Sequence, residues 1–283
     1  MNLLTCGECS LYFAELITSW MNIGAVVTAA GLGTRDGPWT LVFPKALLPL
    51  VVKINGITHI RPMLDLIITT LTRVGCSKIC ITRRSNDDAI VRYTKALWGT
   101  FNVDFTIQDE PRGFGDAVYR GLGCLNNVDW VIVHSDDGFM INESSILVNA
   151  IKFTTNNNID GLIFVRRVND PSRYGVLQGF VEEEPGLYRV TEVEEKPKVP
   201  KSNLALTAVY LFKYSILADA LRKIEDESKP IIEFTDAIKL MVQGKAKVMA
   251  MEVGSKTWFS IGTPSEYILV HEIVRNRDLL EIT

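Results

Sequence analysis

A glycine-rich turn followed by two basic residues offers the clearest chemistry in this chain of 283 residues. Gly31-Leu32-Gly33-Thr34-Arg35 comes directly after an apolar run, Ile23 to Ala29, that is typical of a buried strand. Glycine adopts positive φ and adds no side chain, so the backbone N–H groups of such a turn can converge on a phosphate. Arg35 and, ten positions later, Lys45 would add two cationic donors. The spacing therefore predicts a polyphosphate-binding site.

Two well-known phosphate motifs do not fit this turn. A dinucleotide fingerprint needs a third glycine at position 36, where the chain has Asp36, and a P-loop needs Gly-Lys-Ser/Thr after four spacer residues. A Gly-x-Gly pair alone is weak evidence. The specific signal comes from the residues that accompany the turn downstream, Pro38, Thr40, Pro44, Lys45, Leu48 and Pro49.

Composition excludes several classes of protein. Apolar residues make up 47% of the chain, which is ample for a core, and the net charge of −3 counts against a nucleic-acid binder. The first twenty residues lack a basic segment and contain Glu8 and Glu15, which argues against a secretory signal and a membrane span. Met21 could be the natural start, so residues 1–20 are either a leader outside the natural protein or an added N-terminal helix.

The cysteines favour a cytoplasmic protein. There are five, an odd number in a long chain without a signal peptide, and reduced thiols that pack in the interior are the simplest account. The pairs Cys6-x-x-Cys9 and Cys76-x-x-x-Cys80 could suggest a zinc site. This site is disfavoured because the second pair is loosely spaced and no histidine lies near either pair. The residues concerned are Cys6, Cys9, Cys76, Cys80 and Cys124.

Strand-like runs alternate with helical patterns over the first 170 residues. Such β-α-β alternation predicts an α/β fold, a Rossmann-like, mostly parallel sheet flanked by helices. The expected strands are 23–29, 78–82, 103–107, 129–134 and 161–166; the expected helices are 63–74 (ending at Gly75), 87–97, a short one from Gly115, and 143–154.

Beyond Pro171 the pattern changes to strands with short turns, which predicts antiparallel additions to the sheet. Without a long linker or repeat, residues 21–283 are expected to form a single domain, with its ligand crevice beyond the carboxyl ends of the parallel strands. The expected elements are strands 175–181, 187–193, 204–212 and 246–253, helices near 215–226 and 234–243, and a final helix from Pro264.

Five further segments follow the glycine-rich turn along the chain. They are Gln108-x-x-Pro111-x-Gly113-Phe114-Gly115-x-Ala117, Ser135-Asp136-Asp137-Gly138-Phe139, Arg173-Tyr174-Gly175-Val176, Glu194-Glu195-Lys196-Pro197 with Pro200-Lys201-Ser202-Asn203, and Trp258-Phe259-Ser260-Ile261-Gly262-Thr263-Pro264. In this order the segments closely resemble the sugar-1-phosphate nucleotidyltransferase family, which includes the glucose-1-phosphate uridylyl- and thymidylyltransferases. The resemblance covers about residues 21 to 270, and it implies that the additional antiparallel strands form the sugar-binding part.

The resemblance implies a role for each segment on the nucleotide side. Gly31, Leu32, Gly33 and Thr34 would hold the nucleoside triphosphate, with Arg35 on the β- and γ-phosphates. Lys45 would neutralise charge at the α-phosphate as the sugar phosphate attacks. Gln108 and the Gly113 backbone would bind the edge of the base. The form Gly113-Phe-Gly-Asp-Ala looks nearer to the uridylyl pattern, which favours UTP, with dTTP next.

On the sugar side, the resemblance implies that Glu195 accepts sugar hydroxyl groups and that Lys196 binds the phosphate of the sugar 1-phosphate. Tyr174, Gly175 and Thr207 would shape the hexose pocket, with glucose as the family default. The implied partners are an NTP and a sugar 1-phosphate, without nucleic acid or membrane, and the implied assembly is a homo-oligomer, a dimer or a tetramer.

Each assignment has a plainer alternative. Arg35 and Lys45, taken singly, could be ordinary surface charges, and Gln108 and Gly113 could be simple turn residues before a helix. The three histidines, His59, His134 and His271, have no partner at a useful spacing and receive no catalytic role.

One position departs from the family pattern. The family holds Mg²⁺ between two aspartates; Asp136 matches the first, but Ser260 stands at the second, and a neutral hydroxyl is a poorer ligand for a hard cation. Asp137 is adjacent to Asp136, yet neighbours on a strand point to opposite faces. Glu252 and Glu266 lie nearby in sequence, which leaves open whether either reaches the site.

Two hypotheses follow. In the first, the protein is an active nucleotidyltransferase that uses Mg²⁺ held by Asp136, substrate phosphates and water. In the second, it is a catalytically weak or inactive relative that binds nucleotide or sugar phosphate as a regulatory or partner subunit. The joint presence of Arg35, Lys45, Glu195 and Lys196 favours the enzyme, whereas Ser135 and Ser260 favour the binding subunit.

Overall fold

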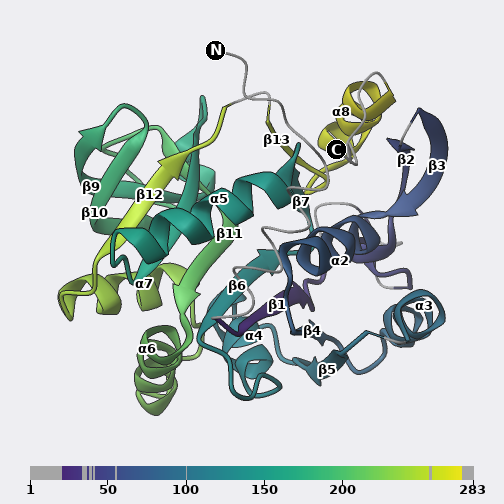
Figure 1. Ribbon diagram of the computed structural model, residues 1–283, viewed down its shortest axis with the longest axis horizontal. Coiled ribbons are helices and arrows are strands. Elements are labelled where there is room, and N and C mark those ends of the chain that lie inside the picture. Colours follow the sequence, from purple (N-terminus) through teal and green to yellow (C-terminus); the bar gives the residue numbers. More distant parts are fainter. Residues whose placement is uncertain are drawn as a thin grey trace.

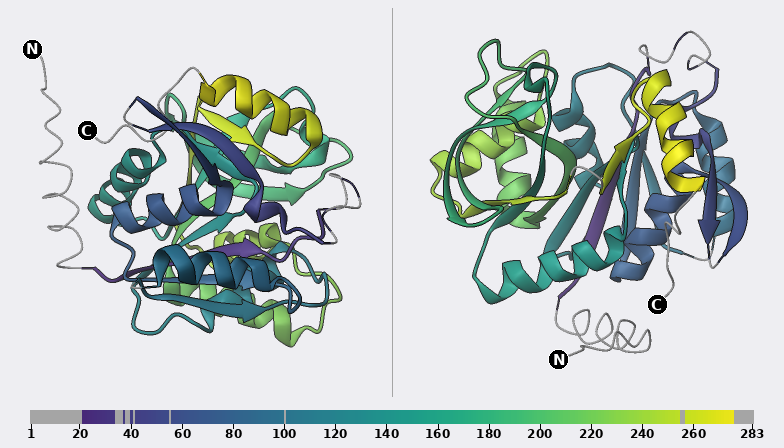
Figure 2. Two further views of the ribbon diagram at one scale, coloured as in Figure 1. Left: turned by 90° about the vertical axis from the view of Figure 1, so that its right-hand side faces the viewer. Right: turned by 90° about the horizontal axis from the view of Figure 1, so that it is seen from above.

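The computed structural model describes residues 21–33, 37, 40, 42–54, 56–99, 101–254 and 257–275. Within these residues a nine-stranded sheet runs through the molecule, with helices on both of its faces (Figures 1 and 2). The expectations for residues 1–20 and for Thr34 and Arg35 lie outside the described residues. The predicted α/β class with a large, mostly parallel central sheet is confirmed.

Four parallel strands form the N-terminal half of the sheet. They are β1 (Ile23–Ala29), β4 (Lys78–Arg83), β5 (Val103–Ile107) and β6 (Trp130–Ser135), in the order β5-β4-β1-β6. All seven residues of β1 are buried, because β4 and β6 pair with it on either side and helices cover both faces. Such two-sided burial explains the unbroken apolar run in the sequence. The carboxyl ends of these strands lie at one edge of the sheet.

The second half of the sheet is mixed. It contains β8 (Gly161–Arg167), β9 (Gly175–Glu184), β10 (Leu187–Glu195), β11 (Leu204–Lys213) and β12 (Val248–Glu252). The predicted antiparallel strand 204–212 corresponds to β11, but it is not an outer addition: it lies between β6 and β8 and runs antiparallel to both. Its nearly continuous burial suits this central position. β11 therefore joins the two halves into one sheet.

The sheet separates the core into two apolar clusters, one on each of its faces, and helices cover both. Alternate β1 residues supply them, Ala25 and Val27 to one cluster and Val26 to the other. α2 and α5 pack into the first cluster, and α4, α6 and α7 pack into the second. The bounds are α2 (Met63–Val74), α3 (Asp88–Trp98), α4 (Phe114–Leu122), α5 (Glu143–Asn156), α6 (Tyr214–Asp226), α7 (Phe234–Gln243) and α8 (Pro264–Arg275).

Several short elements were missed by sequence reasoning. β2 (Pro49–Ile54) and β3 (Ile57–Pro62) form a hairpin beside α8 (Figure 2). β7 (Gly138–Met140) pairs with β13 (Trp258–Ser260), although more than a hundred residues separate them in sequence. Three-residue strands carry no readable period, so only the tertiary structure reveals this pair. The pairing brings the segment containing Ser260 beside the segment containing Asp136.

The cysteines depart in part from expectation. Cys76 is a buried free thiol, as packing predicts. Cys80 of β4 and Cys124 after α4 form a disulfide, with Cα atoms 5.9 Å apart, so the prediction that all five thiols are reduced is wrong for this pair. The reason is that α4 packs on the same face of the sheet as Cys80. Among the described residues, every helix falls short of the length and apolar character needed to cross a membrane.

Candidate active site

A cavity of about 310 Å³ lies where β1 and β6 end. These strands are paired through Thr28 and Ser135, so the segments that follow them emerge side by side. The cavity is at the predicted edge of the sheet and combines residues from three of the sequence motifs. Its lining consists of Gly31, Leu32, Gly33, Lys45, Pro111, Asp136 and Asp137.

The glycine-rich turn adopts the conformation that its composition predicts. Gly33 has φ of +61°, and a Cβ there would approach the Thr40 side chain to 2.9 Å. A side chain at this position would therefore be both strained and crowded. Gly31, in contrast, has open space around it, which leaves its backbone accessible from the cavity.

Lys45 enters the cavity from the short 3₁₀ turn Lys45–Leu47. Its ammonium Nζ lies 2.9 Å from Asp137 Oδ2, and only 8% of its side chain is exposed. Asp137 Oδ1 also accepts a hydrogen bond from Ser135 Oγ. Burial against a carboxylate rules out the alternative that Lys45 is an ordinary surface charge.

Both aspartates after β6 face the same cavity. The expectation that Asp136 and Asp137 point to opposite faces is wrong, because β6 ends at Ser135 and both residues belong to the bend that follows. Burial raises the pKa of Asp136 to about 7; Lys45 lowers it and the neighbouring Asp137 raises it further. A further positive charge in the cavity would therefore favour the ionised form of Asp136.

Ser260 occupies the place that the sequence assigns to a second metal ligand. It pairs with Gly138 in the β13–β7 ladder, and the next amide, Ile261 N–H, donates to the backbone oxygen of Asp137. Ser260 Oγ accepts a hydrogen bond from Gly262 N–H and lies 3.5 Å from Glu266 Oε2. The serine hydroxyl is therefore already engaged by its own loop.

The structure answers which glutamate approaches this site. Glu266, in the first turn of α8, contacts both Ser260 and Thr263. Glu252 instead pairs with Arg167 and accepts a hydrogen bond from Tyr188. Within the described part of the chain, no group of three or more acidic, histidine or cysteine side chains is placed to hold a metal ion by itself.

Gln108 and Gly113 come together at the start of α4. The Gln108 side chain is buried, and its Nε2 donates to the Gly113 backbone oxygen at 3.0 Å and to Asp116 Oδ2 at 2.6 Å. Gly113 has φ of +99°, and a Cβ there would lie 2.5 Å from the backbone oxygen of Ile232. The turn therefore requires glycine for two reasons, conformation and close approach.

The predicted sugar-binding residues form a second group at the ends of β9 and β10. Gly175 pairs directly with Glu195, and the Lys196 N–H donates to the Tyr174 backbone oxygen. The Lys196 ammonium lies 3.1 Å from Glu195 Oε1 and is largely exposed. Burial raises the pKa of Glu233, and the charge of Glu195 adds to that effect, so Glu233 also belongs to this group.

Thr207 sits deeper than its predicted role requires. It is 2% exposed, and its hydroxyl donates to the Phe164 backbone oxygen at 3.1 Å. A shift in the β11–β8 register occurs at this point, and the adjacent Ala208 has φ of +59°. Only the acceptor capacity of the Thr207 hydroxyl remains for a ligand.

Backbone contacts link the segment around Gly113 to the group around Glu195. Ile232 N–H donates to the Arg112 oxygen, and the Ile232 oxygen accepts from Gly115 N–H. The charge of Glu195 raises the pKa of the next residue, Glu233, and the charge of Lys196 lowers it. β11 carries the same connection through the sheet, since it pairs with β6 through Val209 and with β9 through Ala205. Both groups therefore lie along the same edge of the sheet.

Sequence reasoning missed several polar residues around the site. Asp137 was discounted, Glu266 was left open, Glu233 was not considered, and Asp116 was quoted within a motif without a role. Adjacency to Asp136 was the only available signal for Asp137. Sequence proximity to Ser260 was the signal for Glu266, and the contacts of Asp116 and Glu233 become visible only in the folded structure.

The comparisons with known proteins agree with this geometry. The model of the nucleotidyl transferase family matches residues 24–277. The chain belongs to this family. The assignment to sugar-1-phosphate nucleotidyltransferases made from the motifs is thereby confirmed.

Individual relatives are distant. The chain is 29% identical to UTP–glucose-1-phosphate uridylyltransferase 2 of Streptococcus pyogenes serotype M3 over 286 residues, covering 89% of this chain and 92% of the relative. It is 27% identical to a probable mannose-1-phosphate guanylyltransferase 3 of Oryza sativa over 249 residues, covering 86% of this chain and 62% of the relative. Against three curated relatives, the chain spans only 51% to 62% of the relative's length.

A solved structure shares the fold. The crystal structure of a putative glucose-1-phosphate thymidylyltransferase from Bacillus anthracis, in complex with a sucrose, superposes with a TM-score of 0.74 at 20% identity. The match covers 92% of this chain and 98% of the bacterial one. At this identity the likeness supports the fold alone.

Proposed function

We propose that the protein transfers a nucleotidyl group from a nucleoside triphosphate to a sugar 1-phosphate and releases pyrophosphate. UTP is the favoured donor, with dTTP next, and glucose 1-phosphate is the favoured acceptor. The observation that carries the proposal is the cavity itself, which gathers Gly31 to Gly33, Lys45 and Asp136 from three segments at one edge of the sheet. Family membership supports the same reaction class.

In this proposal the phosphate oxygen of the sugar 1-phosphate attacks the α-phosphorus of the triphosphate. A new P–O bond forms, and the bond between the α-phosphorus and the bridging oxygen to the β-phosphate breaks, so that pyrophosphate leaves. The nucleophile is already anionic, so the protein needs to supply positioning and charge stabilisation. Gly31 and Gly33 would present backbone N–H groups, and Arg35, which lies outside the described residues, would contact the leaving phosphates.

Lys45 is the described cation best placed to act on the reacting phosphate. Its Nζ is held by Asp137, so the ammonium group is oriented before substrate arrives. A preorganised charge of this kind stabilises developing negative charge without reorganisation. At the other end of the site, Glu195 would accept sugar hydroxyl groups, and the exposed Lys196 would bind the acceptor's phosphate.

The donor set suits Mg²⁺ that arrives together with phosphates. Mg²⁺ is commonly bound through one or two carboxylates plus substrate phosphates and water. Asp136 would supply the carboxylate; burial is the main cause of its raised pKa, and the charge of a bound cation would lower that pKa. When bound, Mg²⁺ would neutralise phosphate charge. Ser260 would contribute at most a neutral oxygen.

A second candidate, a nucleotide-binding subunit with weak or absent turnover, is favoured by one observation. The Ser260 hydroxyl, at the position where the family resemblance implies a carboxylate ligand, is already hydrogen-bonded within its loop. Such a protein would bind nucleotide but accelerate the reaction little.

One assay separates the two candidates. Pyrophosphate release is measured with UTP, dTTP, GTP or CTP, each with glucose 1-phosphate or mannose 1-phosphate and Mg²⁺, for the wild type and Ser260→Asp. Turnover by the wild type supports the enzyme. An inactive wild type that binds nucleotide and gains turnover in Ser260→Asp supports the binding subunit instead. Inactivity together with absence of nucleotide binding contradicts both.

A further inference from the structure

The side-chain amide of Gln108 is held in one orientation. Its Nε2 carries two protons, and each has a partner: one is donated to the Gly113 backbone oxygen at 3.0 Å and the other to Asp116 Oδ2 at 2.6 Å. A flipped amide would place Oε1 against both of these oxygens, giving two acceptor–acceptor contacts. The hydrogen-bond network thus assigns Oε1 to the side of the amide that faces away from the Gly113 and Asp116 oxygens.

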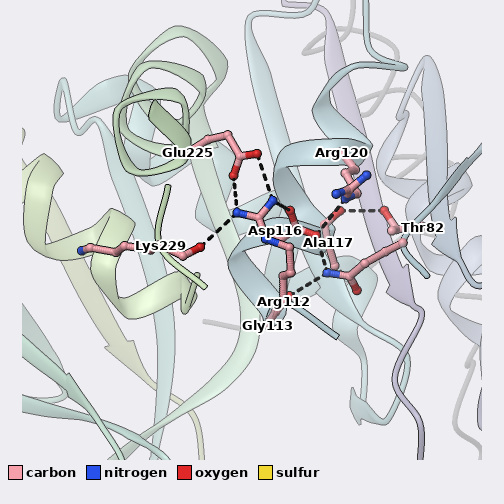
Figure 3. A network of polar contacts seen from close by, with 9 residues as sticks. Thr82, Arg112, Gly113, Asp116, Ala117, Arg120, Glu225 and Lys229 are labelled. Atoms are coloured by element: carbon pink, nitrogen blue, oxygen red, sulfur yellow. Dashed lines mark hydrogen bonds and ion pairs between the residues drawn. The ribbon is translucent and has the colours of Figure 1, made fainter. Parts of the chain in front are cut away.

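Asp116 is itself fixed by two arginines. Its carboxylate is fully buried, and it accepts from Arg120 Nε at 2.8 Å and lies 3.4 Å from Arg112 Nη1 (Figure 3). An ionised carboxylate has acceptors only, so it cannot satisfy the oxygen of Gln108. Arg112 in turn forms two hydrogen bonds with the Glu225 carboxylate and one with the Lys229 backbone oxygen. Arg112 therefore ties the segment that contains Gln108 and Asp116 to α6.

Gln108 Oε1 is left as a free acceptor. Within the described part of the chain nothing donates a hydrogen bond to it, and it is not among the side-chain oxygens sealed from solvent without a partner. A ligand that meets this atom needs a donor. Uracil, thymine and guanine carry a proton on the ring nitrogen of their pairing edge, whereas cytosine and adenine carry a lone pair there and donate only from the exocyclic amino group beside it.

We propose that Asp116 is a positioning residue for base selection: it fixes Gln108 with its oxygen toward the nucleotide, so the site takes bases with a ring N–H and rejects cytosine and adenine. The inference rests on the proposed function, a nucleotide site in which Gln108 meets the base, as the family resemblance implies. Asp116 does not contact the nucleotide and acts through Gln108 alone. The selected class comprises UTP, dTTP and GTP.

The test measures equilibrium binding of UTP, GTP, CTP and ATP to the full chain by calorimetry, with and without Asp116→Asn. The wild type should bind UTP about 10- to 100-fold more tightly than CTP, since an unmatched buried acceptor is costly. The side-chain amide introduced by Asp116→Asn can offer either an oxygen or an NH₂ group to Gln108, so the variant should discriminate less than about threefold. A wild type that binds CTP as tightly as UTP, or a variant with the wild-type ratio, would overturn the proposal.

Two further variants separate positioning from general damage. Glu225→Gln weakens the same network at Arg112 without contacting Gln108, so its UTP-to-CTP ratio should equal that of the wild type. In a Gln108→Met background, adding Asp116→Asn should change the ratio no further, because the two residues act as one unit. A further fall in the double variant would show that Asp116 acts by another route.

A measurement on the unmodified protein covers the case in which Asp116→Asn does not fold. The two NH₂ protons of Gln108, assigned by their loss in Gln108→Met, should exchange slowly with water, with and without UTP. Fast exchange would overturn the proposal.

Failure of the proposed function can be told apart from failure of this inference. Selective binding without pyrophosphate release refutes the transferase but not the base selection. UTP turnover with an unchanged UTP-to-CTP ratio in Asp116→Asn refutes only the base selection. Absence of binding to all four nucleotides refutes both.

Discussion

Asp136 should make the free protein less stable as the pH rises. Its pKa is raised from 3.8 to about 7, first by burial. Because this value is higher in the folded than in the unfolded chain, folding retains a proton between those pH values, and the free energy of unfolding falls through that window. A pKa difference of this size corresponds to about 4 kcal/mol of lost stability above pH 7. We expect about half of that loss, about 2 kcal/mol, because the side chain is partly open to the cavity.

Asp136→Asn removes this titration with little change in shape. Between pH 4 and pH 8, the free energy of unfolding of the variant should rise by about 2 kcal/mol relative to that of the wild type. Urea unfolding at several pH values, in the presence of a chelator, measures the gain. Asp137→Asn is the matched control: it loses the ion pair with Lys45 and should be less stable than the wild type at pH 8. If the difference between Asp136→Asn and the wild type stays constant with pH, the reasoning is refuted.

Three further substitutions test the cavity, the group around Glu195 and a buried pair outside the site. Lys45→Met should lower kcat by about 100-fold in a pyrophosphate-release assay, since a preorganised charge is lost, while the exposed-lysine control Lys223→Met should not. Gly175→Ala places a Cβ 3.0 Å from Glu195 Oε2, so it should raise the KM for glucose 1-phosphate about tenfold and leave UTP affinity, measured by calorimetry, unchanged. Glu143→Gln breaks a fully buried contact with His134 and should cost about 3 kcal/mol in urea unfolding at pH 6. Burial alone would lower the pKa of His134, but the Glu143 carboxylate raises it overall, so this stabilisation is full below pH 6.5 and the cost should shrink as the pH rises through the folded-state pKa. An equal cost at pH 6 and pH 9 would contradict that assignment.

Local patterns predicted most of the regular elements. The helical period of residues 63–74 and the stop at Gly75 agree with α2, and Gly75, directly after the helix, has φ of +89°. The buried run 23–29 agrees with β1. These predictions succeed because periodicity and glycine conformation depend on neighbouring residues in the chain.

Contacts between distant segments were beyond such reasoning. The β7–β13 pair joins two three-residue strands, and β11 lies between β6 and β8 although it follows both in sequence. The Cys80–Cys124 disulfide likewise depends on how α4 packs on β4. Each of these is decided by the packing of the whole sheet, which a local pattern does not contain.

The sequence by itself predicted the chemistry that is proposed for the chain: a glycine-rich turn suited to phosphate, Lys45 near it, and Ser260 where the family resemblance implies a carboxylate ligand. Those properties depend on residue type and short spacing. The tertiary structure alone decided how the groups face one another: both Asp136 and Asp137 in the cavity, Glu266 beside Ser260, and Asp116 holding Gln108. The physical reason is that side-chain orientation is set by partners from other strands and helices, so it exists only once the sheet has assembled.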